Sequence, residues 1–242
     1  MQLYFVRHGQ SSNNHLAATT GSEVGRSDDP VLTDTGIQQA HAAARYLSRR
    51  SGSSPDDLKS LLNLDGFGIT HLYCSLMVRA VHTATIIGDA LGINPVGWED
   101  AHEVGGIYLE NERGEKAGQP GKNQAYFDQH FPRFQYPAQL GADGWHVARH
   151  YEDDQAGRAR AERWLIELVD RHGKTNHQVA VVSHGAFFVH FMRSLLRIPK
   201  VAGHDIWMAL ANCSISRVDF SEHNPVVLYV NRFDYLPTGL VT

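Results

Sequence analysis

The chain has few cysteines, little net charge and no long hydrophobic run, and each shortage narrows what the protein can be. Only two of its 242 residues are cysteines, Cys74 and Cys213, with no motif spacing between them. We expect free buried thiols, because a disulfide would need the fold to bring the two together. The formal charge of −4 gives no basis for binding nucleic acid. No apolar run approaches the roughly 20 residues that span a bilayer, so no membrane partner is expected.

The first residues form an apolar strand pattern without a basic leader or a cleavage site, so we expect a cytoplasmic protein. Hydrophobic residues make up 42% of the chain and charged residues 20%, which is typical of a globular protein. The length suits one domain over residues 1–242.

Alternating strand and helix patterns predict an α/β fold. Apolar runs indicate strands over residues 2–6, 69–75, 179–183, 214–220 and 226–232. Helical periodicity indicates helices over residues 37–47, 77–91, 161–169 and 186–196. This order predicts a three-layer sandwich, with a mostly parallel sheet and helices on both faces.

Two stretches break the alternation. Residues 51–66 are polar and glycine-containing, and we expect a surface excursion there. Residues 104–150 carry scattered Gly, Pro, His and aromatic residues without a clean period. A structureless loop of that length is rare in a compact domain, so we predict an insertion that packs over the sheet edge as a lid. Its aromatic residues either line an apolar pocket or anchor the lid. They are Tyr108, Tyr126, Phe127, Phe131 and Trp145.

Basic side chains follow three of the predicted strands. Arg7 and His8 end the first, Arg79 lies one helical turn beyond the second, and His184 follows the third. Ligand sites in open α/β sheets lie at the carboxyl ends of strands, so these residues are expected to share one crevice. An arginine fork matches phosphate oxygens. The backbone N–H groups of Gly185 and Ala186, which open a helix, add donors for an anion. The pattern predicts a phosphoryl site.

Four motifs at these positions resemble those of the histidine phosphatase superfamily, which has a phosphoglycerate-mutase-like fold. The first is Arg7-His8-Gly9 with Ser11 and Asn14; the second is Leu32-Thr33 with Gly36, Gln39 and Ala40; the third is Ser75 with Arg79-Ala80 and Thr83-Ala84; the fourth is Ser183-His184-Gly185. Three residues depart from the family pattern: Gln10 replaces a common Glu, Leu76 a common Pro, and His82 a common Gln. None is an expected phosphate ligand.

The resemblance implies a role for each motif residue. His8 would be the nucleophile and form a phosphohistidine, while Arg7, Arg79 and His184 would hold the phosphoryl oxygens. Asn14 would add a hydrogen bond in the phosphate pocket. Neutral imidazole is a competent nucleophile near pH 7. Phosphoryl transfer mainly requires positioning and charge stabilisation, which arginines supply, so we expect no metal and no cofactor in the reaction.

The family's proton donor is an acidic residue after the fourth strand, and Glu103 is the best match in this chain. A carboxylic acid whose pKa is raised by partial burial can protonate a leaving alkoxide. Glu99, Asp100 and Glu110 are close in sequence and remain alternatives. His146 and His150 are four residues apart and could share a helix face, but no metalloprotease motif surrounds them. We expect them to be solvated or packed in the lid.

The motifs leave three functions open. A phosphomonoester hydrolase and a phosphoglycerate-mutase-type phosphotransferase share the first chemical step. Mutases of this family typically follow the acidic residue with Arg-x-Tyr-Gly, whereas this chain has Val104-Gly105-Gly106-Ile107-Tyr108, which favours the phosphatase. A non-catalytic module that binds phosphorylated ligands is disfavoured, because both His8 and Glu103 are present. The expected partner is a small phosphorylated metabolite, and a homodimer is compatible with the sequence.

Overall fold

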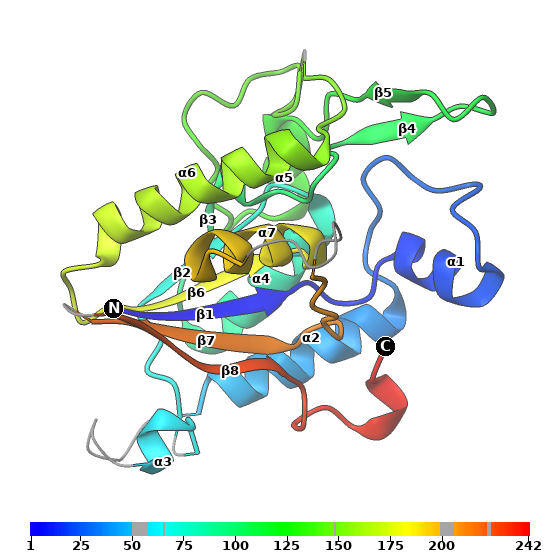
Figure 1. Cartoon of the computed structure of the whole chain (residues 1–242). Coiled ribbons are helices and arrows are strands. Elements are labelled where there is room, and N and C mark those ends of the chain that lie inside the picture. The colour runs from blue at the N-terminus through cyan, green and yellow to red at the C-terminus, as the bar shows by residue number, and fades with distance from the viewer. Residues whose placement is uncertain (50–57, 65, 148, 199–205, 222–223) are drawn as a thin grey trace.

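A six-stranded sheet forms the centre of the computed structural model, which describes residues 1–49, 58–64, 66–147, 149–198, 206–221 and 224–242 (Figure 1). The strand order is β3–β2–β6–β1–β7–β8. The strands are β1 Gln2–Arg7, β2 His71–Cys74, β3 Val96–Gly97, β6 Gln178–Ser183, β7 Ile215–Phe220 and β8 Pro225–Arg232. β3, β2, β6 and β1 are parallel, and β7 is antiparallel to both of its neighbours. The predicted mostly parallel sheet is confirmed.

The central strand β1 is apolar on both sides because it faces two hydrophobic cores. Tyr4 and Val6 belong to one core, and Leu3 and Phe5 belong to the other. Successive side chains of a strand point to opposite faces, so this alternation needs apolar residues at every position. On one face, the Phe5 ring lies 4.9 Å from the ring of Phe188, measured between centroids.

Helices cover both faces of the sheet, as predicted. α2 (Asp34–Leu47) and α4 (Val78–Leu91) pack together in one layer, and α6 (Asp154–His172) and α7 (Gly185–Leu196) pack together in the other. Thr33 caps α2 by accepting the amide hydrogen of Gly36. Helix α6 begins seven residues before the expected start at residue 161, because its first turns are polar and their start is marked by the Asp153 cap.

Three helices are absent from the sequence expectations: α1 (Ser12–Thr20) and the shorter α3 (Leu58–Leu61) and α5 (Gln124–His130). None of the residues of α1 is buried, so it carries no apolar periodicity. It is held by a capping box, in which Ser11 and Asn14 exchange hydrogen bonds between side chain and backbone. Figure 1 shows α1 and the hairpin of β4 (Tyr108–Glu110) and β5 (Lys116–Gly118) beyond the carboxyl end of β1.

The 104–150 segment contains the β4–β5 hairpin and a short helix, α5 (Gln124–His130), and is tied to the rest of the chain by aromatic residues. Phe127, Phe131 and Trp145 are buried in the same core as α4. Gln135 forms a bridge with Val96 of the edge strand β3. These aromatic residues therefore anchor the insertion, whereas Tyr108 lies at the cavity described below. The lid role remains a prediction.

The expected excursion over residues 51–66 is only partly described, since residues 51–57 and 65 lie outside the described ranges. The remainder includes α3 (Leu58–Leu61) and is tied to the sheet. Asn63 is buried and donates a 2.9 Å hydrogen bond to the hydroxyl of Tyr4. Arg217 of β7 donates to the carbonyls of Ser60 and Leu61, both at 2.9 Å. The described part lies at the surface, where Leu62 and Leu64 are exposed, and it is anchored to the sheet by these hydrogen bonds.

Three smaller features complete the fold. Short 3₁₀ helices occur at η1 (Glu99–Ala101) and η2 (Thr238–Leu240). Cys74 and Cys213 are free and buried, as expected.

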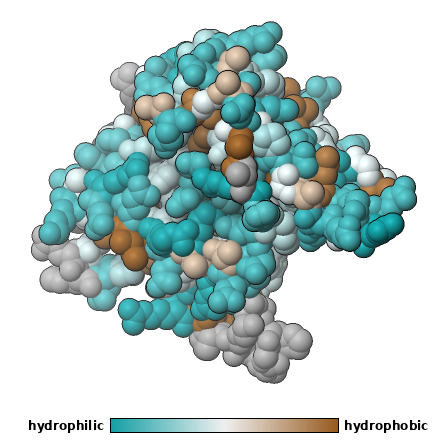
Figure 2. Space-filling view, turned by 90° about the horizontal axis from the view of Figure 1, so that it is seen from above, coloured by the Kyte–Doolittle hydropathy of each residue, from teal (hydrophilic) through white to brown (hydrophobic). Residues whose placement is uncertain are grey.

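Within the described ranges, the helices are too short or too polar to cross a bilayer. Figure 2, a view from above the molecule as drawn in Figure 1, shows a mainly hydrophilic surface with hydrophobic residues in small separate groups.

Candidate active site

A polar cavity of about 240 Å³ opens at the carboxyl end of β1. Five of the predicted site residues line it, namely Arg7, His8, Asn14, Arg79 and Glu103. His184 is buried with its ring centroid 5.0 Å from that of His8, and it is not part of the lining. Gly185 begins α7 and is also outside the lining. The predicted basic groups therefore meet at one point, as their positions at the ends of strands led us to expect.

His8 presents an unprotonated ring nitrogen toward Arg79. Its Nδ1 lies 2.7 Å from the carbonyl oxygen of Gly9, which can only accept, so Nδ1 carries the hydrogen. Its Nε2 accepts a 3.1 Å hydrogen bond from Nε of Arg79. Burial, and then the charges of Arg79 and Arg7, hold the pKa of His8 well below its usual value. The imidazole is therefore neutral at pH 7, as a nucleophile must be.

The backbone around His8 is fixed by two glycines from different motifs. A Cβ on Gly9 would lie 2.5 Å from the carbonyl oxygen of Gly36, and a Cβ on Gly36 would lie 2.1 Å from that of Gln10. Both distances are far below van der Waals contact, so each position requires glycine. The first turn of α2 thus packs directly against the loop that follows His8.

Arg7 supplies a buried donor to the site. One of its terminal nitrogens donates to the carbonyl of Leu210, while its Nε is buried and has no hydrogen-bond partner among the described residues. Buried polar groups are normally paired, so an unpaired guanidinium N–H beside His8 indicates a place for an anion. Burial lowers the pKa of both Arg7 and Arg79 from the usual arginine value.

Asp29 is a site residue that the sequence did not reveal. It is buried, accepts the amide hydrogen of Val78 at 3.0 Å, and lies 4.0 Å from a terminal nitrogen of Arg79. Burial raises the pKa of Asp29 to about 6, against the opposing effect of Arg79. It sits in the polar stretch Ser27-Asp28-Asp29-Pro30, which has no motif spacing to mark it.

His184 is arranged as a neutral donor. Its Nε2 lies 2.9 Å from Oγ of Ser75, and Ser75 already accepts the amide hydrogen of Met77. The Ser75 hydroxyl hydrogen is then available to Nε2, which leaves the ring hydrogen on Nδ1. That Nδ1 is buried and unpaired within the described part of the chain. Burial and the charge of Arg79 hold the pKa of His184 well below its usual value.

Glu103 lies at the cavity and also caps α7. Its Oε1 accepts the amides of Val104 and Phe187, both at 2.9 Å, and its Oε2 accepts the amide of Ala186 at 3.2 Å. The expectation that Ala186 offers its N–H to a bound anion is therefore wrong, because Glu103 already occupies it. Oε2 keeps a free lone-pair position, which is where a proton can be carried.

The three alternative carboxylates do not line the cavity. Those residues are Glu99, Asp100 and Glu110. Glu99 is instead 2.5 Å from the guanidinium of Arg149. Two other acidic residues, Glu23 and Asp28, belong to the lining, but they come from the loop after α1.

Asn14 is oriented by hydrogen bonds to its oxygen. Oδ1 accepts from the amide of Ser11 at 3.2 Å and from Nδ2 of Asn212 at 3.3 Å, so its own NH₂ group is available to the cavity. Asn212 also donates to the carbonyl of His8 at 3.0 Å. No sequence signal pointed to Asn212, which is almost two hundred residues from Asn14.

An arginine and a tyrosine meet at the rim of the cavity. The Arg26 guanidinium lies 4.0 Å from the ring centroid of Tyr108 in the insertion.

The two histidines of the insertion that were considered for a metal lie apart from the cavity: His146 is buried in a turn with Nδ1 3.0 Å from the carbonyl of Gln119, and His150 is exposed. These two histidines share no helix face, so they do not form the pair of metal ligands that their spacing in the sequence would allow.

Comparison with known proteins gives the family. The model of the histidine phosphatase superfamily (branch 1) matches residues 3–55 and 58–232. The "Probable phosphoglycerate mutase GpmB" of Yersinia pestis (strain Pestoides F) is 28% identical over 225 residues, which are 92% of this chain and 86% of the relative.

Solved structures share the fold. A phosphoserine phosphatase from Entamoeba histolytica, in complex with 3-phosphoglyceric acid, has a TM-score of 0.58 and 20% identity, covering 98% of this chain and 99% of its own. A mycobacterial glucosyl-3-phosphoglycerate phosphatase in complex with VO3 has a TM-score of 0.58 and 20% identity, covering 95% and 98%. The match of the family model along nearly the whole sequence shows that this chain belongs to the histidine phosphatase superfamily.

Proposed function

We propose that the protein is a metal-independent phosphomonoester hydrolase that forms a phosphohistidine on His8. One observation carries the proposal: the unprotonated Nε2 of His8, which accepts a hydrogen bond from Arg79, belongs to a site with two buried donors, Nε of Arg7 and Nδ1 of His184, that have no partner among the described residues. An electron-pair donor surrounded by N–H groups suits attack on a phosphorus atom whose oxygens need stabilisation.

In the first step, Nε2 of His8 attacks phosphorus and the bond to the ester oxygen breaks. Glu103 transfers a proton from Oε2 to that oxygen, so the alcohol leaves neutral. Arg79 transfers its Nε hydrogen bond from Nε2 of His8 to a phosphoryl oxygen. Arg7 and His184 bind the remaining oxygens, and Asn14 adds its NH₂ group. Gly185 would bring its backbone N–H to the same group.

In the second step, the Glu103 carboxylate takes a proton from water, and the water oxygen bonds to phosphorus. The bond between phosphorus and Nε2 breaks, which releases inorganic phosphate and restores neutral His8. Each Glu103 proton is returned within the cycle, so the residue acts first as an acid and then as a base. The cycle needs no redox partner, cofactor or Lewis acid.

The hydrolase is favoured over a mutase by the residues that follow Glu103. Gly105 and Gly106 adopt positive φ angles of 94° and 71°, and Gly106 lines the cavity. Mutase-type members typically have an arginine directly after the acidic residue. This chain has Val104 there, an uncharged residue that lines the cavity. The 240 Å³ cavity and the Arg26–Tyr108 pair suit a small phosphorylated metabolite.

The proposal is tested by trapping the intermediate. Wild-type protein turning over a ³²P-labelled phosphomonoester, with a chelator present, is quenched in alkali within milliseconds. We expect an acid-labile label on His8 and its loss in His8→Ala, while His15→Ala, an exposed histidine on α1, keeps it. Steady product release without any labelled histidine would overturn the mechanism, and tight phosphate binding without release would favour a binding module.

A second assay separates hydrolase from mutase. The protein is incubated with 3-phosphoglycerate, and the products are resolved as inorganic phosphate or 2-phosphoglycerate. Phosphate release on a panel of phosphorylated metabolites, without isomerisation, is the expected result. Isomerisation faster than phosphate release would assign the mutase reaction instead.

A further inference from the structure

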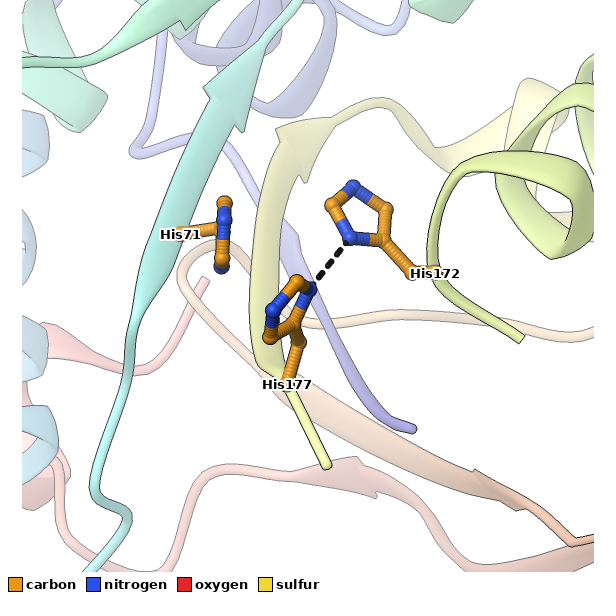
Figure 3. A group of neighbouring side chains, drawn as sticks. All are labelled: His71, His172 and His177. Carbon is orange, nitrogen blue, oxygen red and sulfur yellow. Dashed lines mark hydrogen bonds between the residues drawn. The ribbon is translucent and has the colours of Figure 1, made fainter. Parts of the chain in front are cut away.

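Three histidines meet at the end of the sheet opposite the active site. His71 begins β2, His172 ends α6, and His177 immediately precedes β6. Figure 3 shows their rings gathered between these three elements. At about 3.3 Å per strand residue, the length of β6 places the cluster roughly 20 Å from His184. The cluster is therefore separate from the phosphoryl site.

The ring nitrogens have the spacing of metal ligands. One nitrogen from each ring lies within 4.8 Å of the other two. Nδ1 of His172 and Nδ1 of His177 are 3.0 Å apart. Zinc–nitrogen bonds of about 2.0–2.1 Å in tetrahedral geometry place ligand nitrogens roughly 3.3 Å apart, so a small adjustment admits the ion.

Neighbouring hydroxyl groups orient two of the rings. Thr70 Oγ1 donates to the carbonyl of Gln178 at 3.2 Å, so its 2.9 Å contact with Nδ1 of His71 makes that nitrogen the donor. Nε2 of His71 is then left with a free lone pair. Nε2 of His172 lies 3.2 Å from the hydroxyl of Tyr73, which leaves Nδ1 for an ion. Ligating histidines are typically fixed by such hydrogen bonds from the other ring nitrogen.

Two of the rings are kept unprotonated mainly by burial. Burial and the neighbouring His177 lower the pKa of His71, and burial lowers the pKa of His172 to about 4. A metal ion requires unprotonated imidazole, and His172 meets that requirement at pH 7.

We propose that His71, His172 and His177 form a binding site for a divalent transition-metal ion of the zinc class. Three imidazoles suit Zn²⁺, Cu²⁺ or Ni²⁺, with water completing the shell. His71 and His177 are half-buried, which gives the ion a path from solvent. The ion would tie α6 to two strands and act on stability, because the reacting groups lie at the other end of the sheet. No sequence motif marks the site, since His71 is remote in sequence from the other two.

The test uses Zn²⁺ alone as the probe, with calorimetric titration and elemental analysis after dialysis. Wild type should bind one equivalent, and its Tm should rise by roughly 5 °C or more at a hundredfold excess over Kd. His71→Ala should weaken this binding at least tenfold. His41→Ala, an exposed histidine on α2, is the matched control and should bind as wild type does.

Two further variants distinguish the sites. His177→Gln should also lose the equivalent, whereas His8→Ala, which removes the imidazole at the phosphoryl site, should retain it. Absence of Zn²⁺ binding in wild type would overturn the proposal. So would binding that survives His71→Ala but is lost in His8→Ala, because the ion would then sit in the active site.

Discussion

Mild acid should destabilise this fold steeply because its buried histidines resist protonation. Burial and positive neighbours hold the pKa of His8, His102 and His184 well below the usual value. In the unfolded chain each returns to a pKa of about 6.5. Below that pH the unfolded state binds more protons than the folded state, so stability is complete above pH 6.5 and falls as the pH drops toward the folded-state pKa values.

The size of the effect follows from proton linkage. For one such histidine, lowering the pH from about 6.5 to 5.5 costs about 1 kcal/mol, so three cost about 3 kcal/mol. Asp29 opposes them, since its pKa is raised to about 6 and acid protonates it more readily in the fold. Protonation of that carboxyl in the folded state stabilises the fold by about 0.7 kcal/mol over the same interval. The net loss from these four groups is about 2 kcal/mol, a large share of the 5–15 kcal/mol typical of a domain.

The measurement is urea unfolding at several pH values between these limits, at constant ionic strength. His184→Gln keeps an acceptor or donor for Ser75 but removes one titrating group, so its pH dependence should be shallower by about 1 kcal/mol over the interval. His15→Ala, at an exposed histidine on α1, is the matched control. The comparison uses the slope with pH, so a uniform loss of stability in either variant does not affect it.

An identical pH dependence in wild type and His184→Gln would refute the reasoning, because His184 would then titrate alike in both states. It would also weaken the mechanism, which needs the same burial to keep His8 neutral.

Three further outcomes are expected. Glu103→Gln should slow phenyl and alkyl phosphates by roughly 10²-fold or more and p-nitrophenyl phosphate much less, since poor leaving groups need the proton; equal slowing across leaving groups would remove Glu103 from the donor role. Arg79→Lys should lower kcat by about 10²-fold, because a single ammonium cannot replace the contacts to His8 and the phosphoryl oxygens; near-normal kcat would contradict this. Phe127→Ala should cost about 3–5 kcal/mol in urea unfolding, since its side chain is fully buried, whereas a loss under 1 kcal/mol would show that the insertion is not part of the core.

The sequence predicted strands β1 and β6 well because they are covered on both faces, whereas the two-residue edge strand β3 was not predicted. The apolar runs around Phe5 and Val181 leave few alternatives to a buried strand, and the polar residues that end these runs locate the site. Helix α1 was missed for the opposite reason: it buries no side chain, and its capping box was recognised only as a family motif. The β4–β5 hairpin was missed because its strands have three residues each.

Long-range pairing limited the prediction of the site. Asp29 reaches the start of α4 and Asn212 reaches His8, and neither contact has a sequence spacing that reveals it. The amide of Ala186 was assigned to an anion because a helix amino terminus suggested it, but a side chain of the protein fills that position. Sequence propensities and motifs show which polar groups are present, whereas the fold determines which of those groups already have a hydrogen-bond partner.

The contact between Gly9 and Gly36 ties the geometry of the candidate site to helix α2, which does not line the cavity. Because main chain meets main chain there, no rearrangement of rotamers can absorb a displacement of α2. A methyl group at position 36 would push the segment that carries His8, the proposed nucleophile, without altering any of the proposed reacting groups. Variants in this helix turn are therefore a way to vary attack distance while the chemical groups remain wild type.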